Sequence, residues 1–257
     1  MFDQVLRKLT SKKYNIDYLY SKDYFVFKIE NFFDSDAYNF ISKNFPPVNK
    51  SQLINKFNKF SFNSDTEYYN ELMKNYAFMD IHNFFTSKVF NDFIINKLII
   101  NLFKSRVSDW KYFFRLFKPT SLNNYSNPIL FNNLYSKIQY SYISDEGKIN
   151  PHTDSTKKLI SLMFYFPDDQ VLSLEQQKNF GTKFYINDMQ NYKNEHLEDN
   201  YLIEQFYNSS KLACETKFER YHLYGFIRNS KSWHTVEKIS APKNYFRKSI
   251  NYNIFFK

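Results

Sequence analysis

Three side chains in the second half of the chain have the types and the spacing of a metal site. His152 and Asp154 form a His-Thr-Asp triplet just before an apolar stretch, and His234 follows Asp154 by 80 residues. In an extended segment, residues i and i+2 project to the same side, so His152 and Asp154 can present an imidazole and a carboxylate to one point. Two imidazoles and one carboxylate on one face suit non-haem Fe(II) and leave three coordination positions open. These residues therefore predict an iron site.

A basic residue downstream of His234 could hold a carboxylate beside this metal. Arg247 begins the stretch RKSINY, and Arg247 and Ser249 share one face of an extended strand. The Arg247 guanidinium and the Ser249 hydroxyl on that face could bind one carboxylate together. Lys243 lies nearer to His234 and is the alternative anchor. Tyr142, upstream of His152, either assists at the site or packs in the core.

Short stretches rich in aromatic and β-branched residues must position these side chains. Polar turns separate them, as expected of strands in an antiparallel sandwich. The expected strands are Lys137–Ile143, Leu159–Phe166, Thr182–Ile186, Tyr221–Ile227, Trp233–Ile239 and Tyr245–Phe256. Two longer segments interrupt them, Asp168–Phe180 and Asn187–Glu219, the second with an expected short helix at Leu202–Phe206. Insertions of this kind more often form lids or substrate loops than idle connections.

The N-terminal half is expected to be mainly helical. Asp34 can accept backbone N–H bonds at the start of one helix, which should end near Phe45, before two prolines. Between Asp65 and Lys104, apolar residues recur at three- and four-residue steps and predict helices with core-facing stripes. These stripe residues are Leu72, Tyr76, Met79, Phe84, Phe90, Phe93, Ile94, Leu98 and Leu102.

The composition excludes several classes of protein. The 257 residues carry a formal charge of +9, but no run of five or six basic residues occurs, so nucleic acid is an unlikely partner. The single cysteine, Cys214, rules out an internal disulfide or a cysteine-based zinc site. With three glycines, none close to another, the chain lacks the glycine-rich phosphate loops of P-loop and Rossmann sites.

The same sequence predicts where the protein works. No stretch approaches 18 apolar residues, so no membrane span is expected. The first residues lack the continuous apolar segment of a secretion signal, and we expect the cytoplasm. The sequence gives no indication of the oligomeric state.

Four stretches resemble a known family in their residues and their order. PHTDSTKKLISLMFYF, GTKFY, FIRNSKSWHTV and RKSINY are similar to the 2-oxoglutarate/Fe(II)-dependent dioxygenase superfamily, in its prolyl-hydroxylase-like branch. The resemblance covers roughly residues 137–257. It implies an α+β fold with a double-stranded β-helix (jelly-roll) core and flanking N-terminal helices. The whole chain, 1–257, would then be one oxygenase domain, with a mainly helical flank at 1–130 and the core at 131–257.

The resemblance also implies roles for individual residues. His152, Asp154 and His234 would be the catalytic iron ligands, and Arg247 would bind the distal carboxylate of 2-oxoglutarate, with Ser249 beside it. Tyr142 resembles the tyrosine that commonly assists there, and Tyr165 is a further candidate on the strand after the triplet. Fe(II), 2-oxoglutarate and O2 would be required, and ascorbate is compatible. Because halogenating members lack the carboxylate that Asp154 supplies, hydroxylation is expected.

The substrate stays open at this stage. The resemblance favours a prolyl residue or proline, and the alternatives are another amino acid, a sugar, another small metabolite or a nucleic acid base. Residues that choose substrates in this fold lie on variable loops, here the segments Asp168–Phe180 and Asn187–Glu219. A non-catalytic jelly-roll binding protein is the alternative from another functional class.

Overall fold

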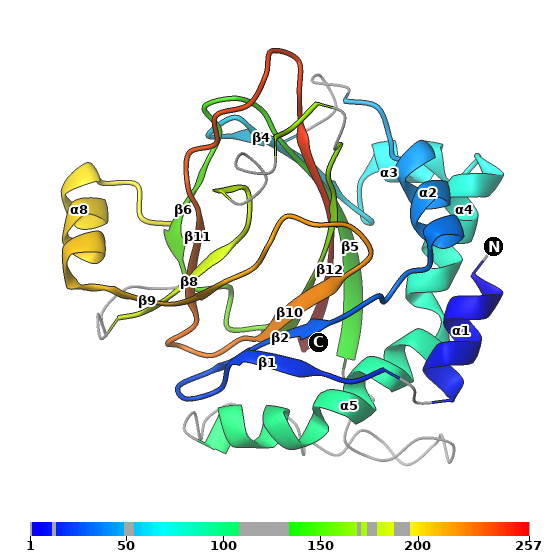
Figure 1. Cartoon of the computed structure of the whole chain (residues 1–257), viewed down its shortest axis with the longest axis horizontal. Coiled ribbons are helices and arrows are strands. Elements are labelled where there is room, and N and C mark those ends of the chain that lie inside the picture. The colour runs from blue at the N-terminus through cyan, green and yellow to red at the C-terminus, as the bar shows by residue number, and fades with distance from the viewer. Residues whose placement is uncertain are drawn as a thin grey trace.

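The computed structural model describes residues 2–11, 14–48, 54–107, 134–168, 171–173, 179–187 and 196–256. Within them helices and antiparallel strands are mixed, as expected of an α+β protein (Figure 1). The helices are α1 (Asp3–Thr10), α2 (Ser35–Lys43), α3 (Glu67–Leu72), α4 (Tyr76–Thr86), α5 (Lys88–Val107) and α8 (Asn200–Ser209). The first seven strands are β1 (Asp17–Tyr20), β2 (Phe25–Ile29), β3 (Ile54–Lys56), β4 (Lys59–Asn63), β5 (Leu134–Ile143), β6 (Ile149–His152) and β7 (Lys158–Phe166). The others are β8 (Lys183–Ile186), β9 (Lys211–Glu215), β10 (Leu223–Ile227), β11 (Trp233–Val236) and β12 (Arg247–Phe256).

The described strands form two antiparallel sheets. The large sheet has the order β1-β2-β10-β7-β12-β5-β4-β3, and the small sheet has the order β6-β11-β8-β9. From β5 onward the chain passes back and forth between them, so that β5, β7, β10 and β12 lie in the large sheet and β6, β8, β9 and β11 in the small one. β12 is central because it pairs with β5 on one side and β7 on the other.

The central strand β12 has two faces of opposite chemistry, since successive side chains of a strand point to opposite sides. On β12, Ile250, Tyr252 and Ile254 belong to a large apolar cluster, whereas the alternate residues Arg247 and Ser249 line a cavity between the sheets. We call the first the outer face and the second the inner face. The alternation is visible in the sequence RKSINYNIFF, where polar and apolar residues take turns.

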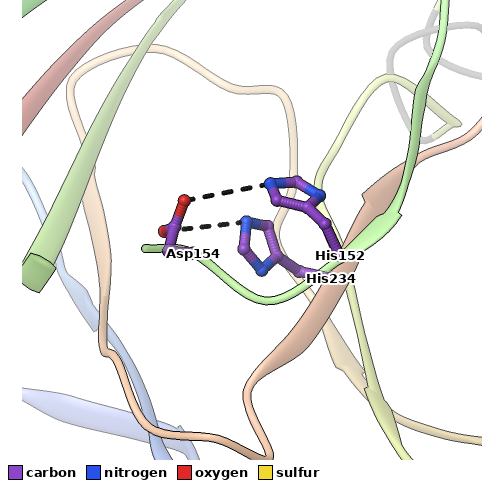
Figure 2. Close-up of side chains that lie close together, drawn as sticks. All are labelled: His152, Asp154 and His234. Atoms are coloured by element: carbon purple, nitrogen blue, oxygen red, sulfur yellow. Dashed lines mark ion pairs between the residues drawn. The ribbon is translucent and has the colours of Figure 1, made fainter. Parts of the chain in front are cut away.

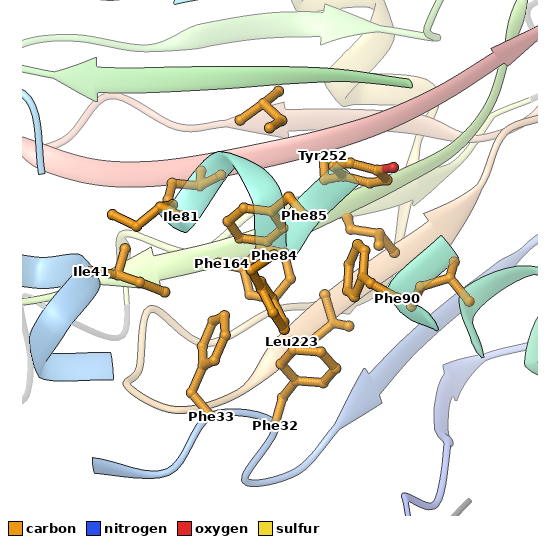
Figure 3. Packing of buried hydrophobic residues seen from close by; sticks show 14 of the residues in the cluster. Phe32, Phe33, Ile41, Ile81, Phe84, Phe85, Phe90, Phe164, Leu223 and Tyr252 are labelled. Carbon is orange, nitrogen blue, oxygen red and sulfur yellow. The ribbon is translucent and has the colours of Figure 1, made fainter. Parts of the chain in front are cut away.

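Aromatic rings pack the N-terminal helices against the outer face. Figure 1 shows α2, α3 and α4 gathered beside β5 and β12, and α8 far away beyond the small sheet. In Figure 3, Phe164 of β7 lies among rings from α4 and from the segment after β2. Its ring centroid is 5.2 Å from those of both Phe85 and Phe33. Such edge and tilted contacts add to the hydrophobic gain of burying each ring.

Several predictions about the helical half are confirmed and one is wrong. Asp34 caps α2, because its side chain accepts a hydrogen bond from the Ala37 backbone N–H at 2.9 Å, and the helix ends at Lys43. Helices α3 to α5 occupy the periodic segment. Tyr76 is not a core residue, since it is 82% exposed at the first turn of α4. The side chain of Leu102 lies outside the described part.

The expected strands are confirmed with shifted ends, but some strands were missed. The short helix expected at Leu202–Phe206 is α8. The segment Asn187–Glu219 is more than an insertion, because it also contributes β9, an edge strand of the small sheet. The residues before 108 add β1 to β4 to the large sheet. Among the described helices, none is long and apolar enough to cross a lipid bilayer.

Candidate metal centre

The small sheet brings the two candidate histidine ligands together. His152 is the last residue of β6, and His234 lies on β11, which pairs with β6 in antiparallel register. The two histidines are direct cross-strand partners, so their side chains leave the sheet side by side. Asp154 follows two residues after His152, and its extended approach carries the carboxylate toward both rings (Figure 2).

The three side chains converge on one point. His152 Nε2 is 3.8 Å from Asp154 Oδ1, and His234 Nε2 is 3.9 Å from Asp154 Oδ2. One ligand atom from each residue lies within 4.8 Å of the other two. These distances are too long for hydrogen bonds, whereas ligand atoms about 2 Å from a shared ion would lie roughly 3 Å apart. A metal would need only a small contraction of this site.

The backbone fixes which imidazole nitrogen faces the site. His152 Nδ1 lies 3.0 Å from the carbonyl oxygen of Asn150, and His234 Nδ1 lies 3.0 Å from that of Ser232. A carbonyl only accepts, so each Nδ1 carries the proton and each Nε2 keeps its lone pair for a metal. The same arrangement at both histidines is what oriented metal ligands require.

The carboxylate is held on one side and open on the other. The ammonium of Lys158 donates to Asp154 Oδ1 at 2.8 Å. Asp154 Oδ2 is buried and accepts no hydrogen bond from any described residue. An unpartnered buried carboxylate oxygen is costly, and a metal ion at the point between the three ligands would remove that cost.

The electrostatics place the ligands in their metal-binding protonation states. Burial lowers the pKa of His152 well below its ordinary value, with His234 and His196 adding to the effect, and burial also lowers the pKa of His234. Burial alone would raise the pKa of Asp154, but Lys158 and the two histidines outweigh it and leave the pKa below its usual range. At neutral pH the site therefore presents two neutral imidazoles and one carboxylate.

Arg247 lies in the same cavity, which has a volume of about 300 Å³. Its side chain is only 3% exposed, its Nε donates to the Phe180 carbonyl at 2.5 Å, and its guanidinium lies 4.9 Å from the ring centre of Tyr165. Burial lowers the pKa of Arg247, yet a guanidinium remains charged at physiological pH. No described carboxylate pairs with it. A buried arginine in this state is prepared for an anion from outside the chain.

The structure brings most of the predicted cosubstrate residues together, but not all. Ser249 and Tyr165 line the cavity with Arg247, and the Tyr165 hydroxyl contacts the hydroxyls of Thr182 and Thr216 at 3.0 and 2.9 Å. Lys243 instead lines a separate pocket near the start of β12.

Tyr142 is not brought to the site. Its hydroxyl donates to the Pro46 carbonyl at 2.7 Å within the outer aromatic cluster. The cause is strand register: Tyr142 pairs with Lys248, whereas Ser141 pairs with the cavity residue Ser249. A role for Tyr142 in contacting a cosubstrate does not fit this geometry.

Sequence reasoning missed several residues of the cavity. Lys158 contacts Asp154, and the ring of His196 lies 3.9 Å from that of His152, centre to centre. Lys59 reaches the cavity from β4. The alternation in RKSINYNIFF was an available signal for two more, because Asn251 and Asn253 continue the face of Arg247. No comparable signal marked Lys59, which is separated from the other site residues by many positions in the chain.

Comparisons with known proteins found only distant similarity, and only among solved structures. Neither a protein-family model nor a curated protein matches the chain. Similar solved structures include a Pseudomonas putida prolyl-4-hydroxylase, with 9% identity, a TM-score of 0.40, and coverage of 99% of this chain and 98% of that chain. HygX from Streptomyces hygroscopicus with nickel, 2-oxoglutarate and hygromycin B bound has 9% identity, a TM-score of 0.46, and coverage of 92% and 83%.

A third similar structure is the Fe(II)/(alpha)ketoglutarate-dependent dioxygenase TqaL, with 10% identity, a TM-score of 0.47, and coverage of 99% of this chain and 88% of that chain. The neighbours thus include members of the class that the sequence resembles. At identities of 10% or less and TM-scores below 0.5, the roles of individual residues depend on the geometry of this chain itself.

Proposed function

We propose that this protein is an Fe(II)- and 2-oxoglutarate-dependent dioxygenase that hydroxylates a C–H bond of a small-molecule or peptidyl substrate. One observation carries the proposal. Two histidines whose Nε2 atoms are free and a carboxylate whose Oδ2 is unpartnered among the described residues converge in a cavity with a buried arginine. The mixed nitrogen and oxygen set on one face suits non-haem iron. The arginine supplies the binding partner for an anionic cosubstrate.

We also propose that the two sheets form a double-stranded β-helix within one domain spanning residues 1–257. The support is the division of β5 to β12 into four strands in each sheet, in the orders β10-β7-β12-β5 and β6-β11-β8-β9. Jelly rolls pair two sheets of this kind and enclose a space between them. The boundary between a flank at 1–130 and a core at 131–257 remains a prediction.

In this proposal each residue has a defined task. His152, Asp154 and His234 would hold Fe(II) and leave its other positions open. Arg247 and Ser249 would bind the distal carboxylate of 2-oxoglutarate, and the ring of Tyr165 would keep the guanidinium in place. The bound iron and cosubstrate would supply the activation of O2, with conversion of 2-oxoglutarate to succinate and CO2. His152, His234 and Arg247 are buried, and burial strengthens the electrostatic contacts that they make.

Proline or a prolyl residue remains the substrate predicted from the resemblance, and ascorbate remains compatible. The alternative of a non-catalytic binding protein differs in one measurable respect, since only an oxygenase converts 2-oxoglutarate to succinate. Release of succinate that requires both Fe(II) and O2 would therefore distinguish the two, and a metal chelator should abolish it.

The decisive test is an anaerobic titration of the metal-free protein with Fe(II) and 2-oxoglutarate. We expect the weak visible band of the chelate, at about 500 nm, in the wild type. Asp154→Ala should lose the band, and Arg247→Met should weaken 2-oxoglutarate binding at least about tenfold, the loss of a charge-assisted pair. Lys248→Met is the matched control, because Lys248 adjoins Arg247 on the opposite face of β12. Absence of the band in the wild type would overturn the proposal.

A further inference from the structure

One cationic side chain of the cavity has no task in the proposed reaction. Lys59 is the first residue of β4 and pairs with Ile143 of β5, which in turn pairs with Arg247 of β12. Directly opposed residues of antiparallel strands share a face, so Lys59 and Arg247 project to the same side. Their backbones are two strand spacings apart, about 10 Å. Lys59 thus lines the cavity two strands away from the predicted cosubstrate anchor, on the same face of the sheet.

Lys59 has no partner of opposite charge in the described part of the chain. Its ammonium makes no ion pair or hydrogen bond there, whereas the other cavity lysine, Lys158, is engaged with Asp154. Burial, with the nearby cations Lys158 and Arg247, lowers the pKa of Lys59 to about 8, although Asp154 opposes the shift. An ammonium held half-buried beside other cations lowers the stability of the fold. A bound anion would offset this cost, and such costs are typical of functional sites.

The charges of the cavity point to the kind of ligand. Lys59, Lys158 and Arg247 are its cationic residues and Asp154 is its acidic one, which leaves an excess of two positive charges. Fe(II) and the 2-oxoglutarate dianion would cancel each other and leave this excess in place. A substrate that carries negative charge would balance it, whereas a cationic substrate would add to the repulsion.

Ile143 lies between Lys59 and Arg247, but the next two rows of the sheet are polar. Ser141 and Ser249 face each other across β5 and β12, and the amides of Gln139 and Asn251 are joined by a hydrogen bond of 3.3 Å in the next row. Hydroxyl and amide groups of this kind bind polar ligands and gain little from apolar ones. The volume of about 300 Å³ fits a small molecule beside the cosubstrate.

We propose that Lys59 binds an anionic group, a carboxylate or a phosphate, of a small polar substrate that is oxidised at the iron. The inference rests on the proposed function and deepens it. Lys59 would fix the charged end of the substrate two strands away from Arg247, so that a C–H bond of the same molecule faces the metal ligands. Arg247 would select the cosubstrate, and Lys59 the substrate.

The test uses the full-length protein loaded anaerobically with Fe(II) and 2-oxoglutarate. Acetate and inorganic phosphate are titrated as separate probes, and calorimetry and the change of the chelate band report binding. We expect saturable binding of at least one anion, weakened at least about tenfold in Lys59→Met and retained in Lys59→Arg. The anion that binds more tightly identifies the group as carboxylate or phosphate. Affinity for 2-oxoglutarate should be unchanged in Lys59→Met.

Lys56→Met is the matched control, because it removes the same charge from the same hairpin at an exposed residue that does not line the cavity. It should bind the anion as the wild type does. Equal anion binding in the wild type and Lys59→Met, or no saturable binding in either, would overturn the inference. A loss of 2-oxoglutarate affinity in Lys59→Met as large as that in Arg247→Met would overturn it too, since Lys59 would then serve the cosubstrate. Failure of the proposed function is distinguishable, because the chelate band itself would be missing.

Discussion

Lys158 shows how one residue can prepare a carboxylate for a metal. Its ammonium holds Asp154 Oδ1 at 2.8 Å, and Oδ2, which accepts no hydrogen bond from a described residue, lies 3.9 Å from His234 Nε2. The carboxylate would therefore bind a metal through one oxygen. Because the ion pair also favours the charged form of Asp154, the ligand is ready without loss of a proton at neutral pH. Lys158 and Asp154 are four residues apart, a spacing that predicts ion pairs only within a helix. Here the segment between β6 and β7 is not helical, so the spacing did not predict this ion pair.

At the same scale, Lys59 should cost stability. Its pKa of about 8 in the folded protein lies below its ordinary value of 10.5, so the unfolded chain binds its proton more tightly. The cost is therefore complete below about pH 8 and disappears as the pH rises past 10.5. Lys59→Met should raise the free energy of unfolding of the metal-free protein by roughly 1–2 kcal/mol at pH 7, allowing for solvent screening.

Urea denaturation of both proteins at pH 7 and pH 10 measures this difference. The gain should shrink at the higher pH, and Lys56→Met should show little gain at either, because Lys56 is exposed. A variant less stable than the wild type at pH 7 would contradict the prediction. Together with the anion titration, the expected result would mean that a residue needed for substrate binding lowers the stability of the fold.

At the scale of the strand, register decides which tyrosine can take part in binding. Tyr142→Phe should leave the affinity for 2-oxoglutarate unchanged but lower the free energy of unfolding by about 1 kcal/mol, because the Pro46 carbonyl loses its hydrogen bond. Tyr165→Phe, on the inner face, should weaken 2-oxoglutarate binding by releasing the contacts with Thr182 and Thr216. Calorimetric titration of both variants with 2-oxoglutarate tests the pair. If Tyr142→Phe alone bound 2-oxoglutarate more weakly, Tyr142 would lie on the inner face, and the assignment of the two faces of β5 would be wrong.

The same register explains what the sequence could and could not reveal. Periodicity shows which residues share a face, so Arg247 and Ser249 were correctly paired. It does not show which face looks inward, and the sequence therefore left Tyr142 open between the site and the core, where strand register places it. From β5 onward, the strands rich in aromatic and β-branched residues were found, whereas β6 contains Pro151 and β9 has no aromatic or β-branched residue, so neither matches a strand pattern. The pairing of β4 with β5 brings Lys59 to the site, and no local sequence pattern predicts that pairing.

At the scale of the whole molecule, one sheet separates two environments. Its outer face packs against aromatic rings from the N-terminal helices (Figure 3). Its inner face carries the polar and charged residues of the cavity beside a second, smaller apolar cluster. The polar cavity residues gain little hydrophobic stabilisation, so the outer cluster and the smaller apolar cluster of the inner face must provide most of it. The helices therefore support the strands that position Arg247 and Lys59. A substitution that destabilises the outer cluster should therefore also destabilise the strands that carry the metal ligands.

Phe85→Ala tests this dependence, because Phe85 of α4 is fully buried and lies far along the chain from the site. The change should cost about 3–5 kcal/mol and shift the urea transition of the whole protein. Trp233, next to His234, reports on the small sheet once Trp110, outside the described residues, is replaced by Phe. Its fluorescence and the far-ultraviolet circular dichroism should shift by the same amount. Tyr76→Ala on the same helix is the matched control, since Tyr76 is 82% exposed and should change stability by at most about 0.5 kcal/mol. If the fluorescence transition stayed in place while the dichroism shifted, the helical flank and the strands of the site would be separate units, and the proposal of one domain would be wrong.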